Sequence, residues 1–196
     1  MSVPALPPLM YVTSRRLMGT GPEIVDTLAE ALWSLPPESV LVYVREPDLD
    51  GLALTELVRA FMPVVHAASQ RLVLRERVDI GKFVGADGVH LPENSFRPDE
   101  VRQLWPSAIL GRSLHDVAML ASPGDVDYVT LSPLFETDSH PGTPPLGMAA
   151  LEEARKSKVP LYALGGIDEA NATSVLATGV HGVAMMRAAW RRVAPL

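Results

Sequence analysis

The chain has 196 residues, of which 47% are hydrophobic, a formal net charge of -6 and no cysteine. This length supports one sizeable core and is short for two domains. The acidic balance argues against a broad basic face for nucleic acid or an anionic membrane. The lack of cysteine excludes disulfides, thiolate nucleophiles and thiolate metal sites.

The first eight residues contain no basic stretch followed by a long apolar core, so we do not expect a signal peptide. No apolar run approaches the roughly 18 residues that a membrane-spanning helix needs. We therefore expect a soluble, cytoplasmic protein. Residues 1–196 are predicted to form a single domain, with residues 1–8 as a short N-terminal extension.

Short apolar runs rich in Val, Leu and Ile alternate with helical segments along the chain, a pattern typical of parallel strands covered on both faces. The expected strands are Leu9 to Thr13, Val40 to Arg45, Arg71 to Arg75, Gly88 to Leu91, Ala108 to Gly111, Tyr128 to Leu131, Pro160 to Leu164 and Gly182 to Met186. The expected helices are Pro22 to Leu35, Leu52 to Ala68, Val78 to Val84, Pro98 to Trp105, Leu114 to Ala121, Met148 to Ser157, Glu169 to Thr178 and Ala188 to Val193.

Eight strand–helix pairs in this order predict an α/β fold, a single compact (β/α)8 TIM barrel. The units are short, because such barrels typically have ~250 residues. The alternative is a doubly wound open sheet, which would have fewer strands and usually a glycine-rich turn after the first one. Here the first strand is followed by Ser14-Arg15-Arg16-Leu17, so the barrel is favoured.

The segment from Ser132 to Gly147 follows the sixth strand and is too rich in proline, glycine and hydroxyl groups for a helix or strand. We expect an active-site loop, because barrels place their chemistry at the carboxyl ends of the strands. Gly165-Gly166 ends the seventh strand, and Asp168 is positioned to cap the next helix. These glycines predict a phosphate site, since they allow close backbone approach. Arg187 either adds a charge to that site or faces solvent.

The second and third strands both end in the dipeptide Arg-Glu, as Arg45-Glu46 and Arg75-Glu76. The arginines either hold an anionic group of a substrate or join the glutamates in ion pairs at the rim, and the residues alone leave both possibilities open. His115 follows the fifth strand and is a candidate acid/base near neutral pH. It is equally well explained as a residue at a helix start.

Together these residues resemble the thiamin phosphate synthase/TenI family of small (β/α)8 barrels, over nearly the whole chain from Tyr11 to Trp190. The segments that carry the resemblance are Val44-Arg-Glu46, Arg77-Val-Asp79, Gly85-Ala-Asp-Gly-Val-His-Leu91, Gly111-Arg-Ser-Leu-His115, Asp127-Tyr128, Leu134-Phe-Glu-Thr-Asp-Ser139 and Ala163-Leu-Gly-Gly-Ile167. The family contains synthases, which join a pyrimidine diphosphate to a thiazole phosphate with Mg²⁺. It also contains TenI-type tautomerases, which aromatise a thiazole carboxylate phosphate.

The chain departs from the synthase pattern at several charged positions. Where synthases have Asn-Asp after the third strand and Asp after the fourth, this chain has Arg75-Glu76 and Ser95. The synthase pattern Gln-x-Arg-x-Lys is replaced by Tyr43-Val-Arg45-Glu-Pro47, and the lysine of the loop after the sixth strand corresponds to His140. These losses weaken the stabilisation of a diphosphate and its metal. The resemblance therefore favours a TenI-like thiazole tautomerase over a synthase.

In that hypothesis the catalytic residue is His115, as the proton carrier, and the reaction needs no metal and no other cofactor. The predicted substrate- and phosphate-binding residues are Arg45, Arg75, Ser113, Ser132, Thr137, Ser139, Gly165, Gly166, Met185, Met186 and Arg187. The partner would be a small phosphorylated thiazole, with neither nucleic acid nor membrane involved, and a homo-oligomer remains open. The alternatives are a thiamin phosphate synthase with altered Mg²⁺ ligands and a non-catalytic regulatory barrel that binds thiazole or thiamin phosphate.

Overall fold

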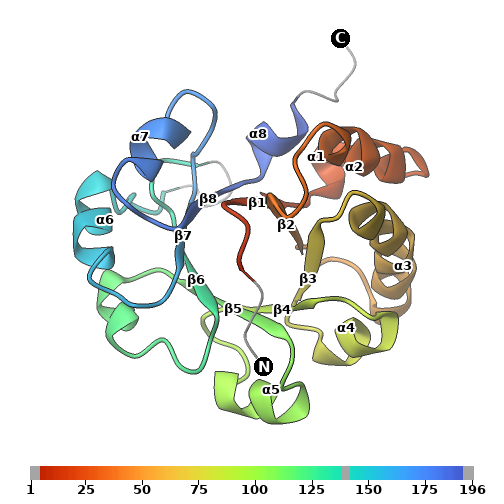
Figure 1. Cartoon of the computed structure of the whole chain (residues 1–196), viewed down its shortest axis with the longest axis horizontal. Helices are drawn as coiled ribbons and strands as arrows, with labels where there is room; N and C mark the ends of the chain where they lie inside the picture. The colour runs from red at the N-terminus through yellow and green to blue at the C-terminus, as the bar shows by residue number, and fades with distance from the viewer. Residues whose placement is uncertain (1–4, 138–141, 192–196) are drawn as a thin grey trace.

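Every second residue of the eight apolar runs packs inward, and the runs pair side by side into a closed parallel barrel in the order β1 to β8 (Figure 1). The computed structural model describes residues 5–137 and 142–191. Its strands are β1 (Leu9–Val12), β2 (Val40–Val44), β3 (Arg71–Arg75), β4 (Gly88–Leu91), β5 (Ile109–Leu114), β6 (Tyr128–Leu131), β7 (Leu161–Leu164) and β8 (Gly182–Met185). The predicted (β/α)8 barrel is therefore confirmed.

Helices surround this ring and cover its outer face (Figure 1). They are α1 (Arg15–Met18), α2 (Glu23–Trp33), α3 (Gly51–Ala67), α4 (Val78–Val84), α5 (Pro98–Leu104), the 3₁₀ helix η1 (Val117–Ala121), α6 (Met148–Ala154), α7 (Ala172–Leu176) and α8 (Arg187–Trp190). The short helix α1 was not predicted.

Two predicted helices begin later than the sequence indicates. The segment expected to be helical from Leu114 starts as the end of β5, and η1 begins only at Val117, where the Asp116 carboxylate accepts a hydrogen bond from the Ala118 amide. The helix expected from Glu169 begins at Ala172. The Asp168 and Asn171 side chains instead stabilise a turn, because each accepts a hydrogen bond from a nearby backbone amide.

The core has two layers that follow from the alternation of side chains along each strand. The inner layer fills the barrel and consists of Met10, Val12, Leu41, Tyr43, Val73, Ile109, Tyr128, Tyr162 and Ala184. The outer layer packs the strands against the helices, for example Val42 and Leu74 against Val58 and Phe61 of α3. The barrel is thus solid below its mouth, and a ligand can reach only its ends.

Residues 5–8 close the amino-terminal end of the barrel (Figure 1). Leu6 packs against the inner layer, and the Pro7 carbonyl accepts a hydrogen bond from the Tyr162 hydroxyl. The Leu6 carbonyl lies 3.1 Å from Nε2 of His181. This part of the predicted extension is therefore integrated into the fold and leaves the opposite end as the candidate site.

Among the residues that the structure describes, no helix combines the length and the apolar character needed to cross a lipid bilayer.

Gly111 makes room for the largest inner side chain. A Cβ atom at Gly111 would lie 2.1 Å from Cζ of Tyr128, and Tyr128 is fully buried.

We predict that Gly111→Val lowers the free energy of unfolding by about 1–3 kcal/mol, because overpacking forces the ring or the backbone to move. Urea denaturation measures this change. The control is Gly51→Ala at the start of α3, where the new Cβ has its nearest neighbour at 3.4 Å and the effect should be within about 0.5 kcal/mol. Equal effects in the two variants would contradict the packing explanation.

Candidate active site at the carboxyl ends of the strands

Strand alternation brings polar side chains together at the mouth of the barrel. Tyr43 and Val73 belong to the inner layer, so Arg45 and Arg75, two residues later, point to the same interior at its upper end. They are neighbours, because β2 and β3 are paired with Val44 opposite Leu74. The same rule places His90 of β4 inside the barrel. The two guanidinium groups thus lie over the buried inner layer.

A pocket opens beside them, between the ends of β6, β7, β8 and β1. Its lining residues are Val12, Arg45, Ser132, Pro133, Thr137, Leu164, Gly165, Gly166, Ile167, Ala184, Met186 and Arg187. Two of these residues are cations, two carry hydroxyl groups, and two are glycines that can present only backbone. None of the lining residues within the described part of the chain is acidic. This composition favours a bound anion such as a phosphate.

The two glycines of this pocket also hold the loop after β6. Gly165 and Gly166 have φ values of 102° and 66°, which disfavour other residues. The Gly165 carbonyl accepts a hydrogen bond from the Phe135 amide at 3.0 Å, and a Cβ at Gly166 would lie 2.6 Å from the Glu136 carbonyl oxygen. A substitution at either glycine would therefore displace the loop as well as any ligand, which makes the glycines poor probes of binding alone.

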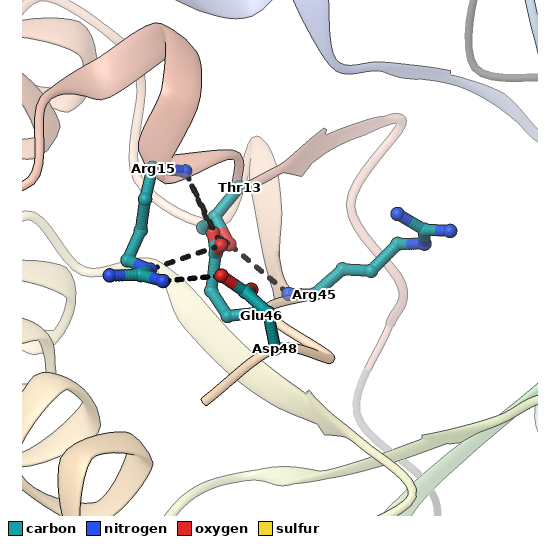
Figure 2. A network of polar contacts seen from close by, with 5 residues as sticks. All are labelled: Thr13, Arg15, Arg45, Glu46 and Asp48. Carbon is teal, nitrogen blue, oxygen red and sulfur yellow. Dashed lines mark hydrogen bonds and ion pairs between the residues drawn. The ribbon is translucent and has the colours of Figure 1, made fainter. Parts of the chain in front are cut away.

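Glu46 fixes the start of α1 and the end of β2 (Figure 2). The residue is 7% exposed, and its carboxylate accepts hydrogen bonds from the Thr13 hydroxyl at 2.7 Å and from the Arg15 amide at 3.1 Å. The Arg15 guanidinium lies 3.6 Å from this carboxylate and also pairs with Asp48. Burial raises the pKa of Glu46, and these donors offset part of the effect.

The same network orients Arg45. The Thr13 hydroxyl accepts a hydrogen bond from the Arg45 amide at 3.1 Å, and Figure 2 shows the Arg45 side chain extending away from Glu46. Glu46 is thus paired with Arg15 and not with Arg45. The sequence left open whether Arg45 holds an anionic group or forms an ion pair with Glu46. The structure favours the first possibility, because Arg45 is directed at the mouth and Glu46 stabilises the neighbouring loops.

His90 forms the polar floor of the mouth on the side of β4 to β6. It is fully buried, with Nδ1 3.0 Å from the Tyr128 hydroxyl and Nε2 2.9 Å from the Ser113 hydroxyl. Burial lowers the pKa of His90 to about 3, and the nearby Arg75 and Arg45 add to this effect. His90 is therefore neutral at pH 7 and holds Ser113. His90 is therefore a core histidine, and its link to Ser113 could not be read from the sequence.

The third polar cluster consists of Arg75, Glu76 and Ser95. One carboxylate oxygen of Glu76 accepts a hydrogen bond from the Ser95 hydroxyl at 2.6 Å, and the other accepts one from Nη1 of Arg75 at 3.0 Å. In the synthases that the chain resembles, aspartates stand at the positions of Glu76 and Ser95, and the resemblance implies that they hold Mg²⁺. Mg²⁺ needs an octahedral set of oxygen ligands, which usually includes free carboxylates.

These residues do not fit a divalent metal. Ser95 has no charge, and both oxygens of Glu76 already accept hydrogen bonds from neighbours. Within residues 5–137 and 142–191, no three His, Cys, Asp or Glu side chains are grouped so that they could hold a metal ion. The guanidinium of Arg75 also places a positive charge beside the carboxylate that would have to bind the cation.

The pocket contains seven of the predicted site residues: Arg45, Ser132, Thr137, Gly165, Gly166, Met186 and Arg187. Met185 was predicted to bind phosphate, but it belongs to the outer layer, because the alternation along β8 turns Met186 inward in its place. Ser139 and His140 lie outside the described residues. Arg75 and Ser113 lie at the same mouth, next to His90.

His115 is not brought to the pocket. It follows the end of β5, its side chain is 44% exposed, and its Nδ1 lies 2.9 Å from a carboxylate oxygen of Glu93. The same oxygen accepts a hydrogen bond from the His115 amide. The contact with Glu93 could not be read from the sequence, because the two residues are brought together by adjacent loops after β4 and β5.

Comparisons with known proteins agree on one family. Residues 9–189 match the family model described as thiamine monophosphate synthase. The chain belongs to the thiamine monophosphate synthase/TenI family. It is 34% identical over 185 residues to the thiamine-phosphate synthase of Roseiflexus castenholzii, covering 92% of this chain and 80% of the relative. It is also 34% identical over 184 residues to that of Methanoculleus marisnigri, covering 91% and 86%.

A solved structure of the family gives the same result. The thiamine phosphate pyrophosphorylase of Pyrococcus furiosus superposes with a TM-score of 0.79 at 26% identity, covering 91% of this chain and 84% of that one. The expectation of a TenI-like thiazole tautomerase is contradicted, because the two sequence relatives are named as thiamine-phosphate synthases, the solved structure as a thiamine phosphate pyrophosphorylase, and none of them as a tautomerase. The substitutions at the synthase metal positions do not outweigh the similarity of the rest of the chain.

We predict that the buried neutral His90 makes stability depend on pH. Its folded pKa lies below the ordinary value of 6.5, so its contribution is present above pH 6.5 and is lost as the pH falls toward 3. The free energy of unfolding of the parent relative to His90→Gln should fall by ~2 kcal/mol between about pH 7 and about pH 5. Urea denaturation at both pH values measures it. A constant difference would show that His90 titrates normally.

Proposed function

We propose that this member of the family is a transferase of the thiamine-phosphate synthase type. It would transfer a pyrimidine group from its diphosphate to a thiazole phosphate, releasing inorganic diphosphate. The observation that carries this proposal is that arginine side chains lie at two adjacent places of one mouth, Arg187 in the pocket and the pair Arg45 and Arg75 beside it, and they would form two anion sites. A transfer between two phosphorylated substrates needs both, whereas a reaction on a single phosphorylated substrate needs one.

The first site would take the thiazole phosphate. Its support is the pocket between β6 and β1, where Arg187, Thr137 and the Gly165-Gly166 backbone meet without an acidic side chain among the described lining residues. The second site would take the diphosphate, and its support is the pair Arg45 and Arg75 on neighbouring strands. Since Arg45 also lines the pocket, the two sites adjoin, which suits direct transfer between their occupants.

Each side chain would have a defined part in this reaction. Arg45 and Arg75 would neutralise the charge that builds up on the departing diphosphate, as fixed cations do in a preorganised site. Ser113, held by neutral His90 at 2.9 Å, would donate or accept a hydrogen bond at the pyrimidine side of the mouth. Glu46 would act indirectly, by holding the backbone from which Arg45 extends.

The proposal predicts that the purified protein makes thiamine phosphate from a hydroxymethylpyrimidine diphosphate and a thiazole phosphate, with equal release of inorganic diphosphate. Oxidation of the product to a fluorescent thiochrome and an enzymatic diphosphate assay measure the two products. If both substrates bind and neither product appears, with or without Mg²⁺, the transferase proposal fails. A non-catalytic phosphate-binding barrel would then be the better description.

Arg187→Ala should raise the KM for the thiazole phosphate about tenfold, because a contact between a guanidinium and a phosphate is worth on the order of 1.4 kcal/mol. The KM for the pyrimidine diphosphate should change little. Arg155→Ala serves as the control for net charge, because Arg155 directly follows α6, has a side chain that is 60% exposed and pairs with Glu152. Equal changes for both substrates in Arg187→Ala would contradict the assignment of separate sites.

A further inference from the structure

The cluster of Arg75, Glu76 and Ser95 has a geometry that suits a different purpose from metal binding. Glu76 has φ of 61°, a left-handed conformation that is uncommon for a residue with a side chain and costs free energy. Its amide donates a hydrogen bond to the His90 carbonyl at 3.0 Å. This conformation turns the Glu76 carboxylate back onto the side chain of the preceding residue, Arg75, so that two consecutive side chains form an ion pair.

Ser95 completes the cluster from the loop after β4. Its hydroxyl donates to Oε1 of Glu76 at 2.6 Å, while Oε2 is engaged by Arg75. The carboxylate is thereby anchored on one side and holds the guanidinium on the other. A guanidinium has five N–H donors in a plane, and the bond to Glu76 engages one of its nitrogens. The arrangement therefore restricts Arg75 and retains its capacity to bind an anion.

The charges at the mouth support the same conclusion. The β2–β3 register places Arg45 next to Arg75, and the Glu46 carboxylate is engaged by Arg15. His90 below them is buried and contributes no charge at neutral pH. Two guanidinium groups therefore face one carboxylate, Glu76, which leaves a net positive charge where a diphosphate would be placed.

We propose that this chain binds a diphosphate group without a divalent metal, with the Arg75 guanidinium supplying positive charge in place of a cation. Glu76 and Ser95 are positioning residues that hold Arg75. The inference rests on the proposed function for its choice of ligand, and it is tested by binding alone. Arg75, Glu76 and Ser95 all differ from the synthase pattern. The inference explains these three differences together, because the three side chains are joined by hydrogen bonds.

The test is calorimetric binding of inorganic pyrophosphate to the full chain, in excess EDTA and again in excess Mg²⁺. We expect binding in EDTA to be at least as tight as binding with Mg²⁺, because the protein supplies the cations and Mg²⁺ in solution competes for the pyrophosphate. Arg75→Ala should weaken binding in EDTA at least about tenfold, and Arg75→Lys should recover part of this loss as a point charge. The control Arg97→Ala removes an equal charge from a side chain that is 71% exposed at the start of α5 and should bind like the parent.

Glu76→Gln separates positioning from metal binding. Glutamine keeps an oxygen that can accept from Ser95 or Arg75, so pyrophosphate binding in EDTA should stay within a few-fold of the parent. If Glu76 were a metal ligand, the variant would lose a Mg²⁺-dependent component of binding. Thermal unfolding of each variant confirms that it is folded, and Arg75→Gln replaces Arg75→Ala if the latter is not.

The inference is overturned if the parent binds pyrophosphate only with Mg²⁺, if it does not bind pyrophosphate at all, or if folded Arg75 variants bind as well as the parent. Metal-independent binding that depends on Arg75, in a protein that makes no thiamine phosphate, would support this inference and refute the proposed transferase. The two proposals can therefore fail separately.

Discussion

In a closed parallel barrel every second side chain of each strand must point inward, and the position of each functional group in this protein follows from that constraint. The inner layer is filled by Tyr43, Tyr128 and Tyr162 together with aliphatic side chains. Arg45 and Arg75 lie two residues beyond the inner-layer side chains Tyr43 and Val73, toward the carboxyl ends of β2 and β3. Other polar groups lie at the same end of the barrel. The polar groups therefore lie directly above the packed inner layer, and the candidate site is confined to the mouth of the barrel.

The two Arg-Glu dipeptides illustrate how one local sequence serves two different arrangements. At the end of β2, Glu46 turns to Thr13 and Arg15, so Arg45 is directed to the mouth and the glutamate joins the loops after β1 and β2. At the end of β3, Glu76 adopts a left-handed backbone and pairs with its own neighbour, Arg75. One arginine is thus positioned through its backbone and the other through its side chain.

Much of the fold could be predicted from the sequence, because the apolar runs are bounded by turn residues and recur in strand–helix order. The run at β3 and those at β4 and β6 were predicted with the observed boundaries. The late starts of η1 and α7 were not, since Asp116, Asp168 and Asn171 bond to local amides and compete with helix formation. The sequence predicted both Met185 and Met186 at the site, because the outward packing of Met185 depends on the register of β8.

The place of residues from a single loop at the mouth of the barrel could be predicted, as with Gly165 and Gly166, which line the pocket. Contacts between separate loops could not, because nothing in the spacing of Ser95 and Glu76, or of Glu93 and His115, shows that they meet. The functional assignment failed for a related reason. The sequence shows the residues at the synthase metal positions one at a time, whereas in the structure Arg75, Glu76 and Ser95 form one hydrogen-bonded unit.

The most direct measurement is a crystal structure of the protein grown in EDTA and soaked with inorganic pyrophosphate and a thiazole phosphate. We expect the thiazole phosphate group at the Gly165-Gly166 turn near Arg187, and pyrophosphate across Arg45 and Arg75 with the Arg75–Glu76 contact retained. Both anions in the same pocket, or pyrophosphate bound away from Arg75, would contradict the arrangement of two adjacent anion sites on which the proposed transfer depends.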